Sequence, residues 1–84
     1  MYDVRVTKLF EKQFKKLDRQ VQQKITEEIE SLRNDPEIGE KLKGVLHDLW
    51  RTRTGDYRIV YRIHSSSNVI EIIYVGHRKD IYKS

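Results

Sequence analysis

Three arginines are the residues of this chain whose type and spacing most clearly suggest chemistry. Arg51 and Arg53 alternate along one segment, and Arg58 follows after the dipeptide Gly55-Asp56. A two-residue loop with Gly in its first central position is typical of a tight β-hairpin. Such a loop places Arg53 directly opposite Arg58, with Arg51 on the same face, whereas a three-residue loop would shift this register by one residue.

The clustered guanidinium groups predict a phosphate-binding surface. Like charges directly opposite each other on a sheet destabilise it, by about 0.2–1 kcal/mol, unless an anion binds between them. Arginine binds phosphate through two parallel hydrogen bonds. The alternative is a solvated strand edge on which Asp48 and Glu71 act as counter-charges. We favour the phosphate site, with Arg62 further along the same face, and expect Arg58 to be exposed and of little importance for folding.

Composition bounds the class of protein. The 84 residues suffice for a single domain, here 1–84, and the net charge of +4, from 17 Lys and Arg against 13 Asp and Glu, favours a polyanionic partner such as RNA or DNA. The alternative is that the charge serves solubility alone. The chain has no Cys, and no two of its three His residues have the spacing of a helical zinc site. We therefore expect no cofactor and no metal.

The N-terminal segment and the hydropathy of the chain favour a cytoplasmic protein. Residues 1–7 include Asp3 and Arg5, which is unlike a signal peptide. No apolar run approaches the roughly 20 residues that a membrane-spanning helix needs. We therefore expect no membrane association.

The first half of the chain predicts a strand and two helices. Residues 2–6 alternate between apolar and polar side chains, as a half-buried strand does. Thr7 and Asp18 are candidate caps for two helices, the second of which ends near Pro36. The apolar stripes of these helices, which should face one core, are Leu9, Phe10, Phe14 and Leu17 in the first and Val21, Ile25, Ile29 and Leu32 in the second.

The second half changes to the two-residue periodicity of strands. After a connector over 37–45, candidate strands cover 46–54, 57–64 and 69–75, and a polar tail covers 77–84. The order strand, helix, helix, strand, strand, strand predicts an α+β fold. In it, the helical hairpin packs on one face of a four-stranded sheet whose last three strands form an antiparallel meander.

The aromatic residues divide into core candidates and one exposed candidate. Trp50 projects to the face opposite Arg51, and Tyr57 and Tyr61 alternate onto the helix-facing side, so all three are expected to pack in the core. Tyr82 lies in the polar tail. An exposed tyrosine near a basic cluster can stack on an RNA base or share a proton.

These segments resemble the RelE/ParE superfamily of toxins, and the RelE branch most closely. The resemblance lies in Leu-Lys-Gly at 42–44, LWRTR at 49–53, GDYRIVY at 55–61 and VGHRKDIY at 75–82, and it covers nearly the whole chain. It implies the RelE-like fold and a toxin paired with a cognate antitoxin protein. Members of this branch enter the ribosomal A site and cut mRNA without metal, by attack of the ribose 2′-hydroxyl on the adjacent phosphate.

The resemblance also implies roles for single residues. Arg58 and Arg78 would stabilise charge on the reacting phosphate, and Tyr82 would stack on a base and take part in proton transfer. His77 is a candidate acid or base, because histidine titrates near neutral pH. Arg53 belongs to the same catalytic group, and the residues expected to bind the RNA backbone are Arg51, Arg53, Arg62 and Lys79.

Two departures from the well-studied member leave the general base open. That member has lysines at the positions of Arg51 and Arg53, and the loop before Arg58 is shorter here. A guanidinium stays protonated in proteins, so the base would be Tyr82 or His77, or the acceleration would come mostly from orienting the RNA.

Two rival functions share the same fold. One is a ParE-like protein that poisons DNA gyrase through protein contacts, and the other is a catalytically degenerate module that only binds an antitoxin. Gyrase poisons generally lack the basic and tyrosine set, so Arg58, Arg78 and Tyr82 argue against the first rival.

Overall fold

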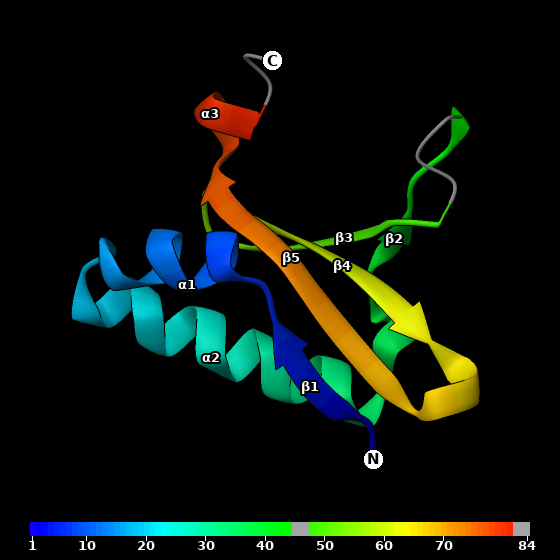
Figure 1. The fold of residues 1–84 in the computed structure, drawn as a ribbon. Coiled ribbons are helices and arrows are strands. Elements are labelled where there is room, and N and C mark those ends of the chain that lie inside the picture. Colours follow the sequence, from blue (N-terminus) through cyan, green and yellow to red (C-terminus); the bar gives the residue numbers. More distant parts are fainter. Residues whose placement is uncertain (45–47, 82–84) are drawn as a thin grey trace.

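The fold is a mixed sheet with two helices packed on one face (Figure 1). The structure, a computed structural model, describes residues 1–44 and 48–81, and of residues 80 and 81 the backbone alone. In chain order the elements are β1 (Asp3–Val6), α1 (Lys8–Lys15), α2 (Arg19–Asn34), the 3₁₀ turn η1 (Pro36–Ile38), β2 (Glu40–Lys41), β3 (Trp50–Thr54), β4 (Tyr57–His64), the 3₁₀ turn η3 (Ser65–Ser67), β5 (Val69–His77) and α3 (Arg78–Ile81).

The sheet has the strand order β1-β5-β4-β3-β2. β1 runs parallel to β5, and the remaining neighbours are antiparallel, so the α+β class and the meander of the last three long strands are confirmed. The expected four-stranded sheet is wrong, because the described chain adds β2, which pairs with β3. β2 has only two residues, which is too short to show the alternation of a strand, so the sequence did not predict it.

Two further boundaries differ from the expectation. The strand predicted over 46–54 begins at Trp50, while residues 46 and 47 lie outside the described part of the chain. The expected polar tail from His77 divides between the end of β5 and the short helix α3. β5 continues through Gly76 to His77, whereas the predicted strand ends at residue 75.

The helix starts follow the predicted caps. The backbone N–H of Phe10 donates to the Thr7 hydroxyl oxygen at 3.0 Å, which caps α1. Asp18 occupies the cap position of α2, but its side chain makes no capping hydrogen bond. Leu9 does not join the apolar stripe as expected, because it is 51% exposed.

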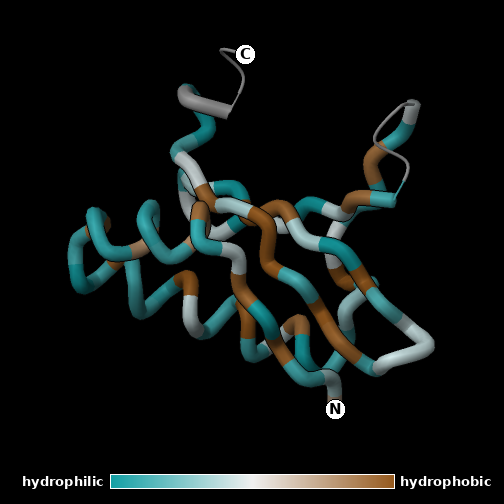
Figure 2. The backbone as a smooth tube through the Cα atoms, viewed as in Figure 1, coloured by the Kyte–Doolittle hydropathy of each residue, from teal (hydrophilic) through white to brown (hydrophobic). Residues whose placement is uncertain are grey.

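The core lies between the helices and the inner face of the sheet. Its buried members are Phe10, Ile25, Leu32, Ile59, Tyr61, Ile70, Ile72 and Val75. Figure 2 shows the long hydrophobic stretch along β5, in the interior of the sheet. Trp50 and Tyr57 pack against this cluster, and Trp50 stacks on Tyr61 with ring centroids 6.3 Å apart, so the expected core roles of these aromatics are confirmed.

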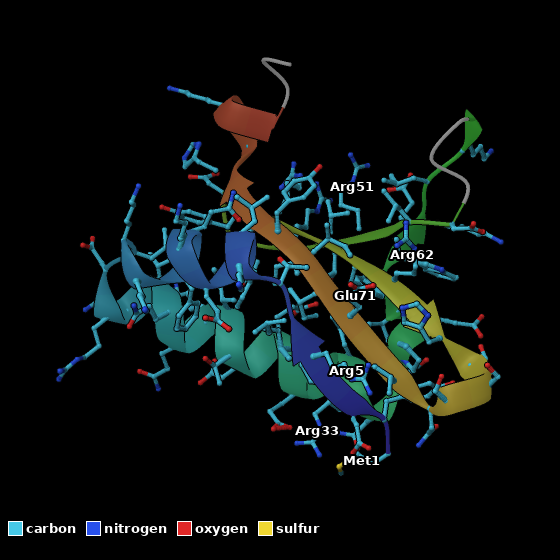
Figure 3. All side chains as sticks on the ribbon, in the orientation of Figure 1. Met1, Arg5, Arg33, Arg51, Arg62 and Glu71 are labelled. Atoms are coloured by element: carbon cyan, nitrogen blue, oxygen red, sulfur yellow. The ribbon has the colours of Figure 1, made fainter. Side chains whose placement is uncertain are left out.

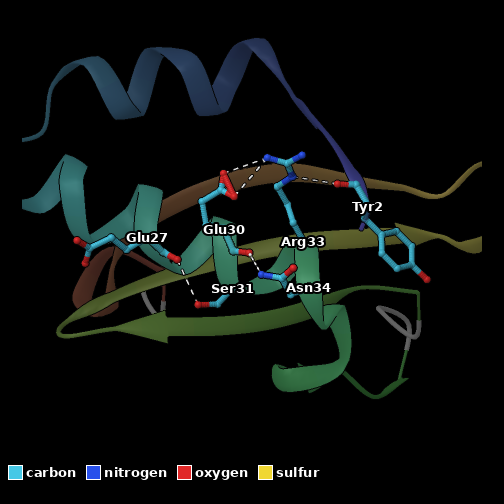
Figure 4. Close-up of polar contacts among 6 residues, drawn as sticks. All are labelled: Tyr2, Glu27, Glu30, Ser31, Arg33 and Asn34. Atoms are coloured by element: carbon cyan, nitrogen blue, oxygen red, sulfur yellow. Dashed lines mark hydrogen bonds and ion pairs between the residues drawn. The ribbon is translucent and has the colours of Figure 1, made fainter.

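The N-terminal strand is fastened to the end of α2 (Figure 4). The Tyr2 N–H donates to the Arg33 carbonyl at 2.9 Å, and the Arg33 Nε donates to the Tyr2 carbonyl at 3.0 Å. Glu30 holds the same guanidinium by an ion pair at 3.0 Å. This arginine therefore serves the fold, on a different part of the molecule from the three-arginine cluster.

Tyr61 fixes the connector to the sheet. Its hydroxyl donates to the Pro36 carbonyl at 2.6 Å, and its ring is fully buried. A Cβ on Gly39 would clash with the Tyr61 hydroxyl oxygen and would lie 2.7 Å from the Arg51 carbonyl oxygen. Only a residue without a side chain allows the connector to approach β3 this closely, so these contacts determine where β2 lies.

The buried hydrogen bond of Tyr61 predicts that the protein loses stability at alkaline pH. Burial raises the pKa of Tyr61 to about 12, and the nearby acidic groups Glu28, Asp35 and Glu37 act in the same direction. The unfolded chain releases this proton near pH 10, so the stabilising contribution is complete below about pH 10 and is lost as the pH rises towards 12. Urea unfolding of the wild type across this range should show that loss.

The matched variant is Tyr61→Phe. It leaves the Pro36 carbonyl without its donor, and we expect it to lower the free energy of unfolding at neutral pH by about 1–3 kcal/mol. The difference in the free energy of unfolding between wild type and variant should shrink above pH 10. A constant difference up to pH 12 would contradict the assignment.

Candidate functional site

The β3–β4 hairpin has the register that the sequence predicts. Thr54 pairs with Tyr57, and Arg53 lies directly opposite Arg58. Gly55 has a φ of +60°, in the left-handed region that a tight hairpin turn requires and that glycine adopts without strain. The placement of two arginines side by side therefore follows from the local sequence of the turn.

The hairpin arginines surround a hollow of about 410 Å³. Its lining includes Arg51 and Arg53 from β3, Arg58 from β4, and residues 38–40 from η1 and β2. The volume falls within the range of small-molecule sites, roughly 300–1,000 Å³. The structure thus brings together three of the predicted site residues, and it adds one wall that the sequence did not predict.

Arg58 is buried, and the expectation that it is exposed is wrong. Only 7% of the residue is accessible, whereas Arg53 is exposed. Arg58 lies on a strand flanked on both sides, opposite Arg53 on β3 and Gly76 on β5. The alternation of β4 did not reveal this burial, because it depends on what packs over the sheet face. Substitution of Arg58 therefore affects packing as well as charge.

A β-bulge sets the residue that neighbours Arg58. The pairing of β4 with β5 shifts between Val60 and Tyr61, so that Val60 pairs with Tyr74 while Tyr61 pairs with Ile72. Because of this shift Arg58 pairs with Gly76 and not with Val75. Bulges of this kind re-aim side chains next to functional sites. Here the bulge puts a residue without a side chain beside the buried arginine.

Glu40 also lines this hollow, and the sequence did not predict its role there. It lies opposite Arg51 in the β2–β3 pairing, and its Oε2 is 3.1 Å from the Arg51 Nη2. The expected counter-charge Glu71 instead contacts His64 at 3.0 Å and Arg62 at 3.8 Å. The sequence alone does not indicate that Glu40 contacts Arg51, because that contact depends on the pairing of β2 with β3.

Arg62 and Glu71 form a separate group on the same open face. Figure 3 shows Arg51, Arg62, Glu71 and Arg5 on the side of the sheet away from α2. Arg62 and Arg5 both lie in register with Glu71, on the two strands that flank β5. Arg62 does not line the hollow of the three hairpin arginines.

The last predicted residues lie where β5 passes into α3. His77 pairs with Tyr57, on the face opposite Arg58, and the two rings meet edge to face at 5.4 Å. The His77 Nδ1 accepts a hydrogen bond from the Lys79 backbone N–H at 3.3 Å, and its Nε2 lies 4.0 Å from Asp56. The structure therefore does not bring His77 into the hollow.

Arg78 and Lys79 are exposed on α3. The Arg78 backbone N–H donates to the Asp56 carbonyl at 2.7 Å, which ties the start of this helix to the hairpin turn. Tyr82 lies outside the described residues. Among the side chains that the structure describes, which end at Lys79, no group of three His, Cys, Asp or Glu could hold a metal ion. None of the helices within 1–44 and 48–81 has the length and apolar character needed to cross a membrane.

Comparison with known proteins gives one family. Residues 4–82 match the family described as the ParE toxin of the type II toxin–antitoxin system parDE. The toxin RelE of Mycobacterium tuberculosis is 36% identical over 52 residues, which cover 62% of this chain and 54% of that protein. The chain thus spans about half the length of the curated relatives that it matches.

Solved structures match over more of the chain. The toxin–antitoxin complex RelBE2 of Mycobacterium tuberculosis matches with a TM-score of 0.85 and 29% identity, covering 92% of this chain and 98% of that chain. The archaeal RelE–RelB complex of Pyrococcus horikoshii matches with a TM-score of 0.77 and 30% identity, over 92% and 94%.

Together the mixed sheet, the helical hairpin and the family match define the class as the toxin of a type II toxin–antitoxin system. The chain belongs to this toxin family, and it is also similar to the RelE toxins of Mycobacterium tuberculosis and Pyrococcus horikoshii. The predicted RelE-like fold is confirmed.

The pairing of Arg53 with Arg58 predicts that charge repulsion at the site lowers the free energy of unfolding. Replacing Arg53 with Gln removes the repulsion with Arg58, and we expect the free energy of unfolding to rise by about 0.2–1 kcal/mol at low salt. The gain should shrink in part at high salt, because salt screens the charge of the exposed Arg53 but acts less on the buried Arg58. Urea unfolding at two salt concentrations measures both effects.

Arg51→Gln is the matched control. Its charge is already countered by Glu40, so this variant should gain less stability than Arg53→Gln. If Arg53→Gln were less stable than the wild type at both salt concentrations, the opposed arginines would not be a source of strain.

Proposed function

We propose that this toxin is an endoribonuclease that cleaves mRNA in the ribosomal A site without a metal ion, and thereby inhibits translation. The observation that carries the proposal is the hollow in which Arg51, Arg53 and Arg58 converge. Arginines held opposite each other reduce stability unless an anion binds them, and their planar groups suit phosphate. The resemblance to the RelE branch supplies the substrate class.

The reaction at this site is a transfer within the RNA strand. The ribose 2′-oxygen attacks the adjacent phosphorus, the 2′-hydroxyl proton leaves, and the bond from phosphorus to the 5′-oxygen breaks. The 5′-oxygen gains a proton, which yields a cyclic phosphate and a free 5′-hydroxyl. Arg58, with Arg53 and Arg78, stabilises the extra negative charge that builds up on the phosphate during this step.

The proton transfers need a group other than arginine, because guanidinium does not deprotonate in proteins. Tyr82 is our first candidate, although a free tyrosine titrates near pH 10 and would need neighbouring cations to lower that value. His77 is the second candidate. Its Nδ1 accepts from the Lys79 N–H, so only its Nε2 is available to exchange a proton. The arginines also accelerate the reaction by aligning the attacking 2′-oxygen with the phosphorus.

The remaining basic residues extend the binding surface. Arg51 binds the phosphate backbone at the hollow. Arg62, on the same open face, and Lys79, on α3, bind neighbouring phosphates of the mRNA. The phosphate contacts position the strand and do not select its sequence.

A cognate antitoxin is the proposed protein partner. The RelBE2 structure of Mycobacterium tuberculosis and the RelE–RelB structure of Pyrococcus horikoshii are both toxin–antitoxin complexes, and this chain matches more than nine-tenths of one chain in each. The net charge of +4 suits a partner with an acidic segment.

The second candidate function is poisoning of DNA gyrase. The observation that favours it is the family description, which is that of the ParE toxin. This activity requires neither ribosomes nor RNA, so a single assay separates the two candidates.

The test is mRNA cleavage during translation in a reconstituted system, with primer extension to map the ends. We expect cuts that need ribosomes and no divalent ion at the active site. Arg58→Ala should reduce the rate by roughly 10²–10³-fold, as loss of one charge-stabilising donor does. Tyr82→Phe should also slow cleavage. Arg19→Ala, on α2, is the control and should cleave normally.

The burial of Arg58 requires a measurement of folding beside the assay. Arg58→Lys keeps the charge and most of the stem, and both Arg58 variants should be checked by urea unfolding. Loss of cleavage in a folded Arg58 variant supports the site. A folded, antitoxin-free wild type that makes no cuts would contradict the proposal, and gyrase inhibition would be tested next.

A further inference from the structure

The hollow of the three arginines contains an anion of its own. The Glu40 carboxylate lies 3.1 Å from the Arg51 guanidinium, and both residues line the hollow. We propose that Glu40 is a specificity-determining residue, whose carboxylate competes with phosphate for Arg51 and so weakens the binding of RNA that the ribosome does not present. The inference rests on the proposed function of the hollow as a phosphate site.

The position of Glu40 is built into the fold. The hydrogen bond from the Tyr61 hydroxyl to the Pro36 carbonyl anchors the turn before β2. Gly39 then brings the backbone of β2 against the Arg51 carbonyl, where a Cβ would meet that oxygen at 2.7 Å. The next residue, Glu40, therefore faces Arg51 in the strand pairing. Buried contacts therefore hold the backbone of Glu40 opposite Arg51, while the carboxylate itself remains exposed.

The exposure of the two partners makes the pairing reversible. The Arg51 side chain is 25% exposed, whereas the Glu40 side chain is 72% exposed. A carboxylate that reaches into water can turn away at little cost, and an exposed ion pair contributes only a small amount of free energy. A phosphate can therefore displace Glu40 from Arg51, and the guanidinium stays in the hollow.

This competition acts unequally on different RNAs. A strand that diffuses freely must be bound by the arginines alone, so each lost contact lowers its occupancy. A strand held by the ribosome is already placed at the site, and its effective concentration there is high. The Glu40 carboxylate therefore weakens the binding of free polyanions more than the binding of the proposed substrate. Specificity is gained here by weakening the unwanted complex.

The test measures binding of a short single-stranded DNA oligonucleotide to the free protein by fluorescence anisotropy, at several salt concentrations and without ribosomes. The probe lacks the 2′-hydroxyl and is not cleaved by the proposed reaction. Glu40→Gln keeps the shape of the side chain and removes its charge. We expect it to bind about three-fold to five-fold more tightly, as expected for removal of an exposed competing charge.

Glu37→Gln is the matched control. It changes the net charge by the same amount, and Glu37 lies exposed on η1 and does not line the hollow. The salt dependence of binding should become steeper in Glu40→Gln, by about 0.7 in the slope of log K against log salt if one more phosphate is bound. Glu37→Gln should leave the slope unchanged.

A double variant separates this inference from the proposed function. In the Arg51→Gln background, Glu40→Gln should no longer improve binding, because the residue it releases is gone. If Arg51→Gln weakens binding but Glu40→Gln behaves like Glu37→Gln, the role of Glu40 is wrong and the phosphate site stands. If neither Arg51→Gln nor Arg53→Gln weakens binding, the hollow is not a phosphate site and the proposed function loses its basis.

Discussion

The strand register that places Arg53 directly opposite Arg58 is the constraint on which the rest of the site depends. The hairpin turn at Gly55 places the two residues directly opposite each other in the strand pairing, and the β-bulge gives Arg58 a glycine as its other neighbour. A sheet has no structural reason to bring like charges together, because the pair reduces its stability. The arrangement becomes favourable when an anion binds, which is why we interpret the hollow as a site for phosphate.

The opposite face of the sheet carries the hydrophobic core that stabilises the fold. Tyr61 and Trp50 stack beneath the arginines, and the apolar stripe of α2 covers the strands from that side. Tyr61 also fixes the connector, and through Gly39 it determines where Glu40 meets Arg51. Core packing and the electrostatics of the site are therefore coupled through one buried tyrosine.

The sequence predicted those parts of the molecule that depend on local signals. The turn residues and the alternation of β3 and β4 sufficed to place Arg53 opposite Arg58. The position of Glu40 and the burial of Arg58 could not be predicted in this way. Both depend on packing between segments that are distant in the chain: β2 against β3, and the cover over an interior strand. Such contacts leave no periodic pattern in the sequence.

The central claim is that the hairpin arginines bind the phosphates of a nucleic-acid strand. The most direct measurement follows the side-chain Nε–Hε NMR signals of the arginines during titration with a non-cleavable oligonucleotide. Our account predicts saturable shifts for Arg51, Arg53 and Arg58, while Arg33, whose Nε donates to the Tyr2 carbonyl at 3.0 Å, stays unchanged. An oligonucleotide that binds without shifting the three hairpin arginines would contradict the account.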